Sequence, residues 1–325
     1  MGFKQIDKKI VKEWLCTDGI VEQYKFIKQK DDETGLETLR RMFQMTSGSF
    51  DDYFKEAIGG NGDEEENLTT IYSSALLSLL FFSSAVENGG LKLEAVPDKV
   101  FTKCYFEYKN PVLKTRPNHS YPSNVDCVLV DKEDSAIVFV ESKFAEYVYD
   151  YGEFDPNSKA NLKDSYRCAG EYTENVAQFF DRLVQEGHAH YYYGIKQMIT
   201  HYSGICNFIE GRYHRNSTSN RKMEVINAYK NGAKVYLMEI VYDMSKIKND
   251  EYAVITGYKT CLDDYKAVQG EITKLINDES RQKALPLTAL PLTTYQQLVA
   301  FADNSSKIHE SIKKFYRLCD DDLNL

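Results

Sequence analysis

The chain has 325 residues, enough for one large domain or two small ones, and its 42% apolar and 27% charged residues are ordinary for a globular protein. Its formal net charge of −9 excludes a protein whose entire surface binds nucleic acid. A nuclease with a locally basic cleft is still compatible with this charge, because a bound metal ion neutralises part of the phosphate charge.

The cysteines and the apolar segments indicate the cellular compartment of the protein. Seven cysteines are scattered along the chain without a CxxC pair, which predicts neither a disulfide framework nor a zinc site. The N-terminus lacks the apolar core of a signal peptide, and the most apolar run, residues 71–86, is shorter than the ~20 residues that span a bilayer. We therefore expect a cytoplasmic protein with no membrane partner.

Residues 1–66 are predicted to form a helical N-terminal extension. Apolar residues recur there at helical spacing. They are Ile10, Val11, Trp14 and Leu15, and then Leu36, Leu39, Met42 and Phe43. A run of glycines and acids at residues 59–67 predicts a loop that ends the extension.

The predicted core opens with a buried helix over residues 68–86, which Asn88 and two glycines end. Strands are expected at residues 91–96 and 103–108. The second places Lys103, Glu107 and Lys109 in alternation with apolar residues, the pattern of a half-exposed strand.

Residues 124–144 predict a β-hairpin of two apolar strands joined by a charged turn. If Asp131 pairs with Ala136 across this turn, Asp126 lies opposite Glu141. Lys143 is two residues further on, so it shares the face of Glu141. Facing carboxylates inside apolar strands repel each other, and a divalent cation with Lys143 beside it would compensate them. The simpler alternative is an ion pair between Glu141 and Lys143 at a strand end, with Asp126 capping a turn.

The order Asp126, fourteen residues, then Glu141-Ser142-Lys143 on adjacent strands resembles the PD-(D/E)XK nuclease superfamily. The run that continues into Glu146 and Tyr147 looks like an uncharacterised bacterial branch of it. Val125 stands where the motif in its literal form has proline. The resemblance implies an α/β restriction-endonuclease-like core at residues 67–282, with a mixed central sheet flanked by helices. Residues 283–325 would then be C-terminal helices packed on the core.

The resemblance also implies a chemistry, the metal-dependent hydrolysis of phosphodiester bonds by an endonuclease with a possible place in restriction or defence. Mg²⁺, or alternatively Mn²⁺, would be held by Asp126, Glu141 and the main-chain carbonyl of Ser142. Lys143 would orient or activate the attacking water and stabilise negative charge. Its pKa would fall only if burial outweighs its acidic neighbours. DNA is the expected substrate; RNA and a homodimer stay open.

Further candidates lie outside the motif. Relatives carry a glutamine, with a tyrosine four residues later, on the helix after the ExK strand. On the helix predicted from residue 194, Gln197 matches the glutamine, and His201 stands at the place of the tyrosine. Some relatives place another carboxylate on the first core helix, where Glu87 is the nearest. Gln197 and His201 could instead face solvent, and Glu87 could be a solvated acid at the helix end.

Two basic segments could contact phosphates. The loop at residues 111–122 carries Lys114, Arg116 and His119, and residues 211–222 are the most basic run of the chain. The alternative for both is an ordinary solvated loop.

The remaining elements complete the prediction. We expect helices at residues 171–185, 263–276, 294–301 and 308–318, strands at 233–242 and 252–255, no regular element between Lys143 and residue 164, and a linker at 281–292. Two non-nuclease hypotheses stay open, a non-catalytic nucleic-acid-binding or scaffold protein that keeps the fold, and an unrelated α/β protein.

Overall fold

The computed structural model describes residues 33–59, 73–113, 118, 122–149, 192–218, 221–247 and 256–319. Several predictions lie outside these residues. They are the helices near residues 10–15 and 171–185, the strand at 252–255, most of the loop at 59–67, and Lys114, Arg116 and His119.

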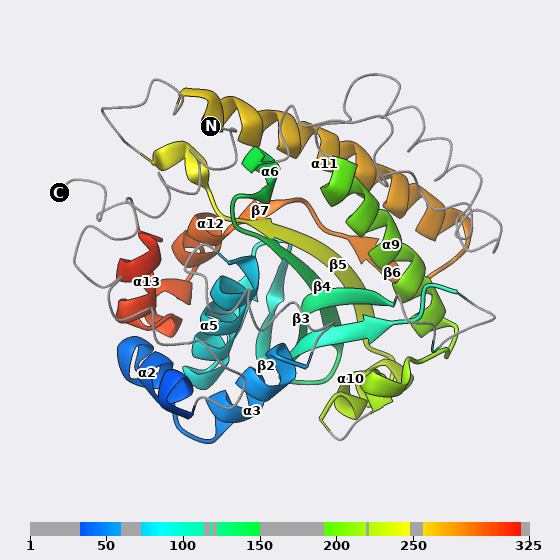
Figure 1. Cartoon of the computed structure of the whole chain (residues 1–325). Coiled ribbons are helices and arrows are strands. Elements are labelled where there is room, and N and C mark those ends of the chain that lie inside the picture. The colour runs from blue at the N-terminus through cyan, green and yellow to red at the C-terminus, as the bar shows by residue number, and fades with distance from the viewer. Residues whose placement is uncertain are drawn as a thin grey trace.

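One mixed β-sheet forms the centre of the molecule, with the strand order β1-β2-β3-β4-β5-β6 and β7 paired to β5. The antiparallel part comprises β1 (Leu91–Leu93), β2 (Val96–Asn110), β3 (Ser123–Asp131) and β4 (Ala136–Lys143). The parallel part adds β5 (Lys234–Val241), β6 (Leu287–Ala289) and β7 (Thr293–Thr294). The sheet curls between two groups of helices, which confirms the predicted α/β architecture (Figure 1).

The two groups of helices cover opposite sides of the sheet (Figure 1). One group is α2 (Glu33–Phe43), α3 (Ser49–Ala57), α5 (Ser74–Glu87), α12 (Tyr295–Ala300) and α13 (Glu310–Tyr316). The other is α9 (Tyr192–Ile209), α10 (Met223–Lys230) and α11 (Thr256–Gln282). Short 3-10 turns lie at Arg215–Thr218, Met244–Lys246 and Asn304–Lys307.

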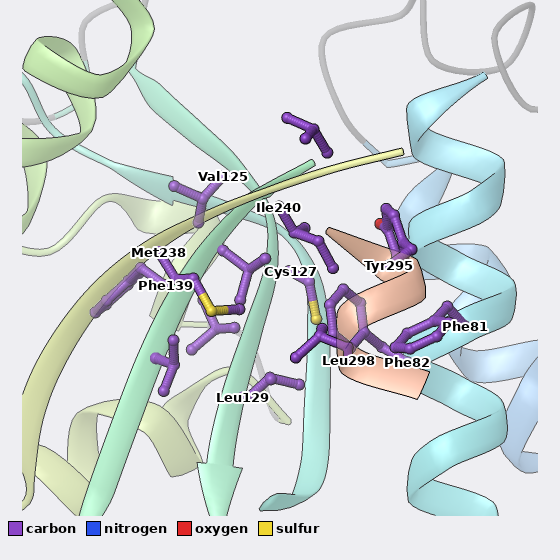
Figure 2. Close-up of a cluster of buried hydrophobic side chains, with 14 of the residues drawn as sticks. Phe81, Phe82, Val125, Cys127, Leu129, Phe139, Met238, Ile240, Tyr295 and Leu298 are labelled. Atoms are coloured by element: carbon purple, nitrogen blue, oxygen red, sulfur yellow. The ribbon is translucent and has the colours of Figure 1, made fainter. Parts of the chain in front are cut away.

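Helix α5 is the buried helix that the sequence predicts, but it begins later than expected. The Ser73 side chain accepts a hydrogen bond from the Leu76 N–H at 3.3 Å, and this N-cap sets the first residue at Ser74. The helix is apolar on almost every side because the sheet, α3 and Tyr295 of α12 all pack against it. Figure 2 shows Phe81 and Phe82 against Tyr295.

The predicted hairpin is confirmed, including its register. The pairing runs from Val130 opposite Ile137 to Cys127 opposite Val140. The side chain of Asp131 closes the turn, because its Oδ1 accepts hydrogen bonds from the main-chain N–H groups of Ser135, at 2.6 Å, and Ala136, at 2.7 Å. Local turn chemistry thus fixes which residues of the two strands face each other.

The end of strand β2, residues 104–110, is buried on both faces and not half-exposed as predicted. Glu107 is 4% exposed and Lys109 is 6% exposed. The segment after α9 covers this strand, with the Lys222 Nζ donating to the main-chain oxygen of Glu107 at 2.7 Å and the Ser217 hydroxyl donating to that of Lys109. Alternation in the sequence could not reveal this second layer.

The predicted linker at residues 281–292 is wrong, because this segment belongs to the sheet. Leu287 pairs with Val235 and Ala289 with Leu237, so β6 extends the parallel part. Its flanking prolines, Pro286 and Pro291, fit an edge strand, where a missing N–H costs little. Residues 283–319 therefore supply two strands as well as α12 and α13.

Two smaller differences concern helices. α11 is longer than the predicted 263–276, and a short helix, α6 (Glu146–Tyr149), follows β4 where no regular element was expected. The Tyr147 hydroxyl of α6 donates to the main-chain oxygen of Tyr242 at 2.9 Å and so ties α6 to the end of β5. Within the ranges given above, no helix combines the length and apolarity needed to cross a bilayer.

Candidate active site at the open end of the hairpin

Asp126 and Glu141, hereafter the acidic pair, stand one position beyond the last paired residues of β3 and β4. The Asp126 Oδ2 accepts a hydrogen bond from the Ser142 N–H at 2.6 Å. The carboxylate of β3 thus reaches across to the main chain of β4. The predicted convergence of these two acids on one end of the hairpin is what the structure contains.

Glu141 is buried, 2% exposed, and binds two side chains that can carry positive charge. The Lys143 Nζ donates to Glu141 Oε1, and the His201 Nε2 lies 2.8 Å from Glu141 Oε2. The other ring nitrogen of His201, Nδ1, lies 2.6 Å from the Ser123 hydroxyl oxygen. Each oxygen of the Glu141 carboxylate is therefore held by a different side chain.

These contacts move the pKa values of the acidic pair in opposite directions. Burial raises the pKa of Glu141, but the positive charge of Lys143 and the hydrogen bonds from Lys143 and His201 outweigh it and lower that pKa to about 2. Burial, and then the negative charge of Glu141, raise the pKa of Asp126 well above its ordinary value. The acidic pair is thus an electrostatically strained site, which is typical of functional centres.

The pKa of Lys143 is raised, which answers the question that the sequence left open. Burial lowers it, but the nearby carboxylates, Glu141 first, followed by Glu146 and Asp126, more than offset burial. Lys143 is 5% exposed and is positively charged at neutral pH.

Ser142 anchors the site to the helices on the other side of the sheet. Its hydroxyl oxygen lies 2.7 Å from the Tyr295 hydroxyl oxygen, and it donates to the Ser74 main-chain oxygen at 3.2 Å. Since α5 begins at Ser74 and α12 begins at Tyr295, the start of each helix fixes the strand that carries Glu141 and Lys143.

His201 comes from a stripe of α9 that lies on the sheet. A Cβ atom added at Gly204 would come within 2.9 Å of the Cβ atoms of Asn110 and Ser123, and one at Gly194 within 2.3 Å of the Tyr265 hydroxyl oxygen. Gln197 and His201 lie between these glycines at helical spacing. Gly204 therefore lets α9 approach β2 and β3, and Gly194 lets it approach α11, so neither polar residue is on a solvent face.

Gln197 makes no hydrogen bond with the acidic pair. Its side-chain oxygen is buried, and among the described residues it has no hydrogen-bond partner. Since residues four apart on a helix are neighbours, Gln197 lies one turn from the histidine that holds Glu141. The sequence-based role of Gln197 stays a prediction.

Glu239 belongs to the same region, and the sequence analysis missed it. It pairs with Glu141 across β4 and β5, is 2% exposed, and accepts a hydrogen bond from the Tyr265 hydroxyl of α11. Burial is the main cause that raises its pKa to about 8. The available signal was a single acid inside the apolar strand at residues 233–242.

Glu87 lies elsewhere. It ends α5, whereas Ser74, which contacts Ser142, begins it, and fourteen residues of helix span about 20 Å. The Glu87 carboxylate accepts hydrogen bonds from the Thr46 N–H at 3.1 Å and the Ser49 hydroxyl at 3.0 Å. The structure therefore does not bring Glu87 to the acidic pair.

The last two residues of the basic run at 211–222 contact other parts of the protein. The Arg221 guanidinium pairs with Glu56 at 3.1 Å and lies over the Tyr53 ring, 4.7 Å from its centroid. Lys222 is 7% exposed, with its Nζ on the Glu107 main-chain oxygen. These two residues fasten the end of the segment to β2 and α3, so the alternative of a solvated loop is wrong for them. Arg215 of the same run is exposed, and a phosphate contact of this run stays a prediction.

The donor atoms at the acidic pair are carboxylate and carbonyl oxygens. Within the part of the chain that the structure describes, no group of three or more His, Cys, Asp or Glu side chains is arranged to hold a metal ion. In comparisons with known proteins, no family model, curated protein or solved structure matches the chain.

Proposed function

We propose that this protein is a metal-dependent nuclease that hydrolyses phosphodiester bonds of DNA at the acidic pair. One observation carries the proposal: two acidic side chains from neighbouring strands converge beside a buried lysine and a buried histidine, both of which bind Glu141. Interior carboxylates are costly unless a partner compensates them. Two carboxylates that stay close together in the interior are therefore expected to bind a positively charged ligand.

The donor set fits Mg²⁺ or Mn²⁺. Mg²⁺ is commonly bound through one or two carboxylates, waters and the phosphates of the substrate, so two protein carboxylates are sufficient. Asp126 and Glu141 would hold the ion, with the main-chain carbonyl of Ser142 as a further ligand. Asp126 uses Oδ2 for the Ser142 N–H, which leaves Oδ1 for a cation. A bound Mg²⁺ supplies a Lewis acid that neutralises charge on the phosphate.

The side chains around the acidic pair have separate roles in this proposal. Lys143 is positively charged, so it orients the attacking water by donating a hydrogen bond and stabilises the negative charge that develops on the phosphate. The raised pKa of Lys143 favours this role over proton abstraction. His201 keeps the Glu141 carboxylate in one orientation, as partners of metal-binding carboxylates commonly do.

DNA is the proposed substrate, with RNA as the alternative polymer, and a homodimer would allow both strands of a duplex to be cut. A binding protein without turnover is the less favoured function, because two basic residues of the predicted loop, Arg221 and Lys222, bind groups of the protein itself. Phosphate neutralisation then depends on the metal ion and Lys143.

Cleavage assays test the proposal. Supercoiled plasmid and a single-stranded oligonucleotide are incubated with the protein in Mg²⁺, Mn²⁺ or EDTA, alongside the variants Glu141→Ala and Glu133→Ala. Glu133 is the matched control, an exposed acid at the turn of the same hairpin. We expect cleavage that requires the metal and Glu141 but not Glu133. Salt-sensitive binding without cleavage, or cleavage by Glu141→Ala, would contradict it.

A further inference from the structure

Glu239 has one carboxylate oxygen that is satisfied and one that is not. Oε1 accepts the hydrogen bond from the Tyr265 hydroxyl, whose oxygen in turn accepts one from the Gln269 Nε2 at 3.0 Å. Oε2 is buried, and among the described residues it has no hydrogen-bond partner. A buried polar atom without a hydrogen-bond partner costs free energy, about 1–3 kcal/mol. Such an atom calls for a functional explanation.

The strand register places Lys143 one diagonal position from Glu239, which makes it the candidate for the missing donor. Glu239 pairs with Glu141 across the two parallel strands, and Lys143 lies two residues beyond Glu141, on the same face. Side chains of this length reach a diagonal neighbour on the next strand. An ammonium group has three N–H donors, and Lys143 places one of them on Glu141 Oε1. Its electrostatic interaction with Glu239 raises the Lys143 pKa, which agrees with this proximity.

Glu239 is also held firmly in place. Tyr265 belongs to the long helix α11, and α9 approaches it so closely at Gly194 that a Cβ there would lie 2.3 Å from the hydroxyl oxygen. Tyr265 is 2% exposed. The Tyr265 hydroxyl therefore fixes Oε1 and, with it, the direction of Oε2.

We propose that Glu239 Oε2 is a second acceptor for the Lys143 ammonium, which turns from Glu141 to Glu239 when a divalent cation takes Glu141 Oε1. The inference rests on the proposed function, since it presumes a cation at the acidic pair. Glu239 is then a positioning residue. It keeps Lys143 charged, buried and beside the site while Glu141 serves the ion.

Metal binding tests this exchange without any measurement of cleavage. Mn²⁺ is titrated calorimetrically into the full-length wild type, Glu239→Gln, Lys143→Ala and the double variant Lys143→Ala/Glu239→Gln. A cation at the acidic pair and the approaching ammonium favour the ionised form of Glu239, whose pKa is otherwise raised to about 8. An amide oxygen is a poorer acceptor for an ammonium than this carboxylate, so we expect Glu239→Gln to weaken Mn²⁺ binding about tenfold when Lys143 is present. In the Lys143→Ala background the same change should cost less than about twofold, because no ammonium needs a new acceptor. An equal loss in both backgrounds, or no loss in either, would overturn the proposal.

A second measurement needs no metal and separates this inference from the proposed function. In protein with ¹⁵N-labelled lysine, Glu141→Gln weakens the first acceptor, so the Lys143 ammonium should bind Glu239 and keep a slowly exchanging NMR signal. Adding Glu239→Gln should abolish this signal, while Glu133→Ala leaves it unchanged; circular dichroism checks the fold of each variant. If the signal is the same with and without Glu239, the inference fails even where Mn²⁺ binds. If Mn²⁺ binds wild type and Asp126→Asn equally, the metal site itself fails, whatever the NMR result.

Discussion

Glu141 and Glu87 are two shielded acids of the same protein that differ in what holds them. Glu87 accepts hydrogen bonds from a main-chain N–H and a serine hydroxyl, and the His309 Nε2 lies 3.8 Å away. Glu141 is held by the side chains of Lys143 and His201. Burial opposes ionisation in both, yet the pKa of each is lowered by its partners.

The two sets of donors suggest a structural role for Glu87 and a functional role for Glu141. A main-chain amide stays in place when its acceptor changes, so the contacts of Glu87 serve to tie the start of α3 to the end of α5. Charged side chains can move, so the contacts of Glu141 can be exchanged for a cation or a substrate. The His309 side chain is the largest cause that lowers the Glu87 pKa, so the pKa direction alone does not separate the two acids; the main-chain donor from Thr46, which Glu87 has besides, does.

The largest expected effect is on cleavage. Glu141→Gln should lower the rate of metal-dependent DNA cleavage at least about a hundredfold, because it removes a charge that the metal ion requires. Glu87→Gln should change the rate less than twofold, since its carboxylate lies at the far end of α5. Plasmid cleavage under single-turnover conditions measures both. A comparable loss of cleavage rate in Glu141→Gln and Glu87→Gln would contradict the assignment of different roles to the two acids.

The second effect is on stability, and here Glu87 is the sensitive residue. Glu87→Ala leaves the Thr46 N–H and the Ser49 hydroxyl without their acceptor and should destabilise the fold by about 2 kcal/mol. Urea denaturation measures it, with Glu37→Ala on an exposed face of α2 as the control. Equal midpoints for Glu87→Ala and the control would mean that Glu87 ties nothing together.

The histidines should show a smaller contrast. His201→Gln keeps a side chain near the Glu141 carboxylate but loses the defined hydrogen bond at 2.8 Å, so kcat/KM for cleavage should fall about tenfold. His309→Gln should leave kcat/KM within about twofold. Steady-state kinetics on an oligonucleotide substrate measure kcat/KM for both variants. A kcat/KM of His201→Gln equal to that of the wild type would contradict the positioning role of His201.

The smallest effect is the pH dependence that Glu87 gives to stability. Because the pKa of Glu87 is lower in the folded protein than in the unfolded chain, its contribution is fully present above the unfolded value of about 4.3 and is lost as pH falls toward the folded value. The difference in unfolding free energy between wild type and Glu87→Gln should thus be constant from pH 7 to pH 5 and shrink below that. A difference that grows on acidification would give the pKa shift the opposite sign.

The sequence could predict the hairpin because its information is local. The turn after Asp131 and the two apolar strands lie within one short segment, and together they fix the register. The same reasoning located α5, α9 and β5, whose periodicity lies within each element. It placed Asp126, Glu141 and Lys143 at one end of one hairpin.

The rest depends on contacts between distant segments. Glu239 pairs with Glu141 through a parallel crossover, and no local turn fixes such a register. His201 is buried because Gly204 lets α9 approach β2 and β3, and the sequence does not show this closeness until the partner strands are known. Arg221 and Lys222 likewise turn inward toward groups supplied by α3 and β2. A basic run by itself does not reveal which way its side chains point.

The most direct test is to locate a divalent cation. Crystals of the protein soaked in Mn²⁺ should give an anomalous scattering peak between the carboxylates of Asp126 and Glu141, and crystals of Asp126→Asn treated in the same way should lack it. A peak at another place, or none with Mn²⁺ in the crystal at a concentration that supports cleavage, would contradict the account.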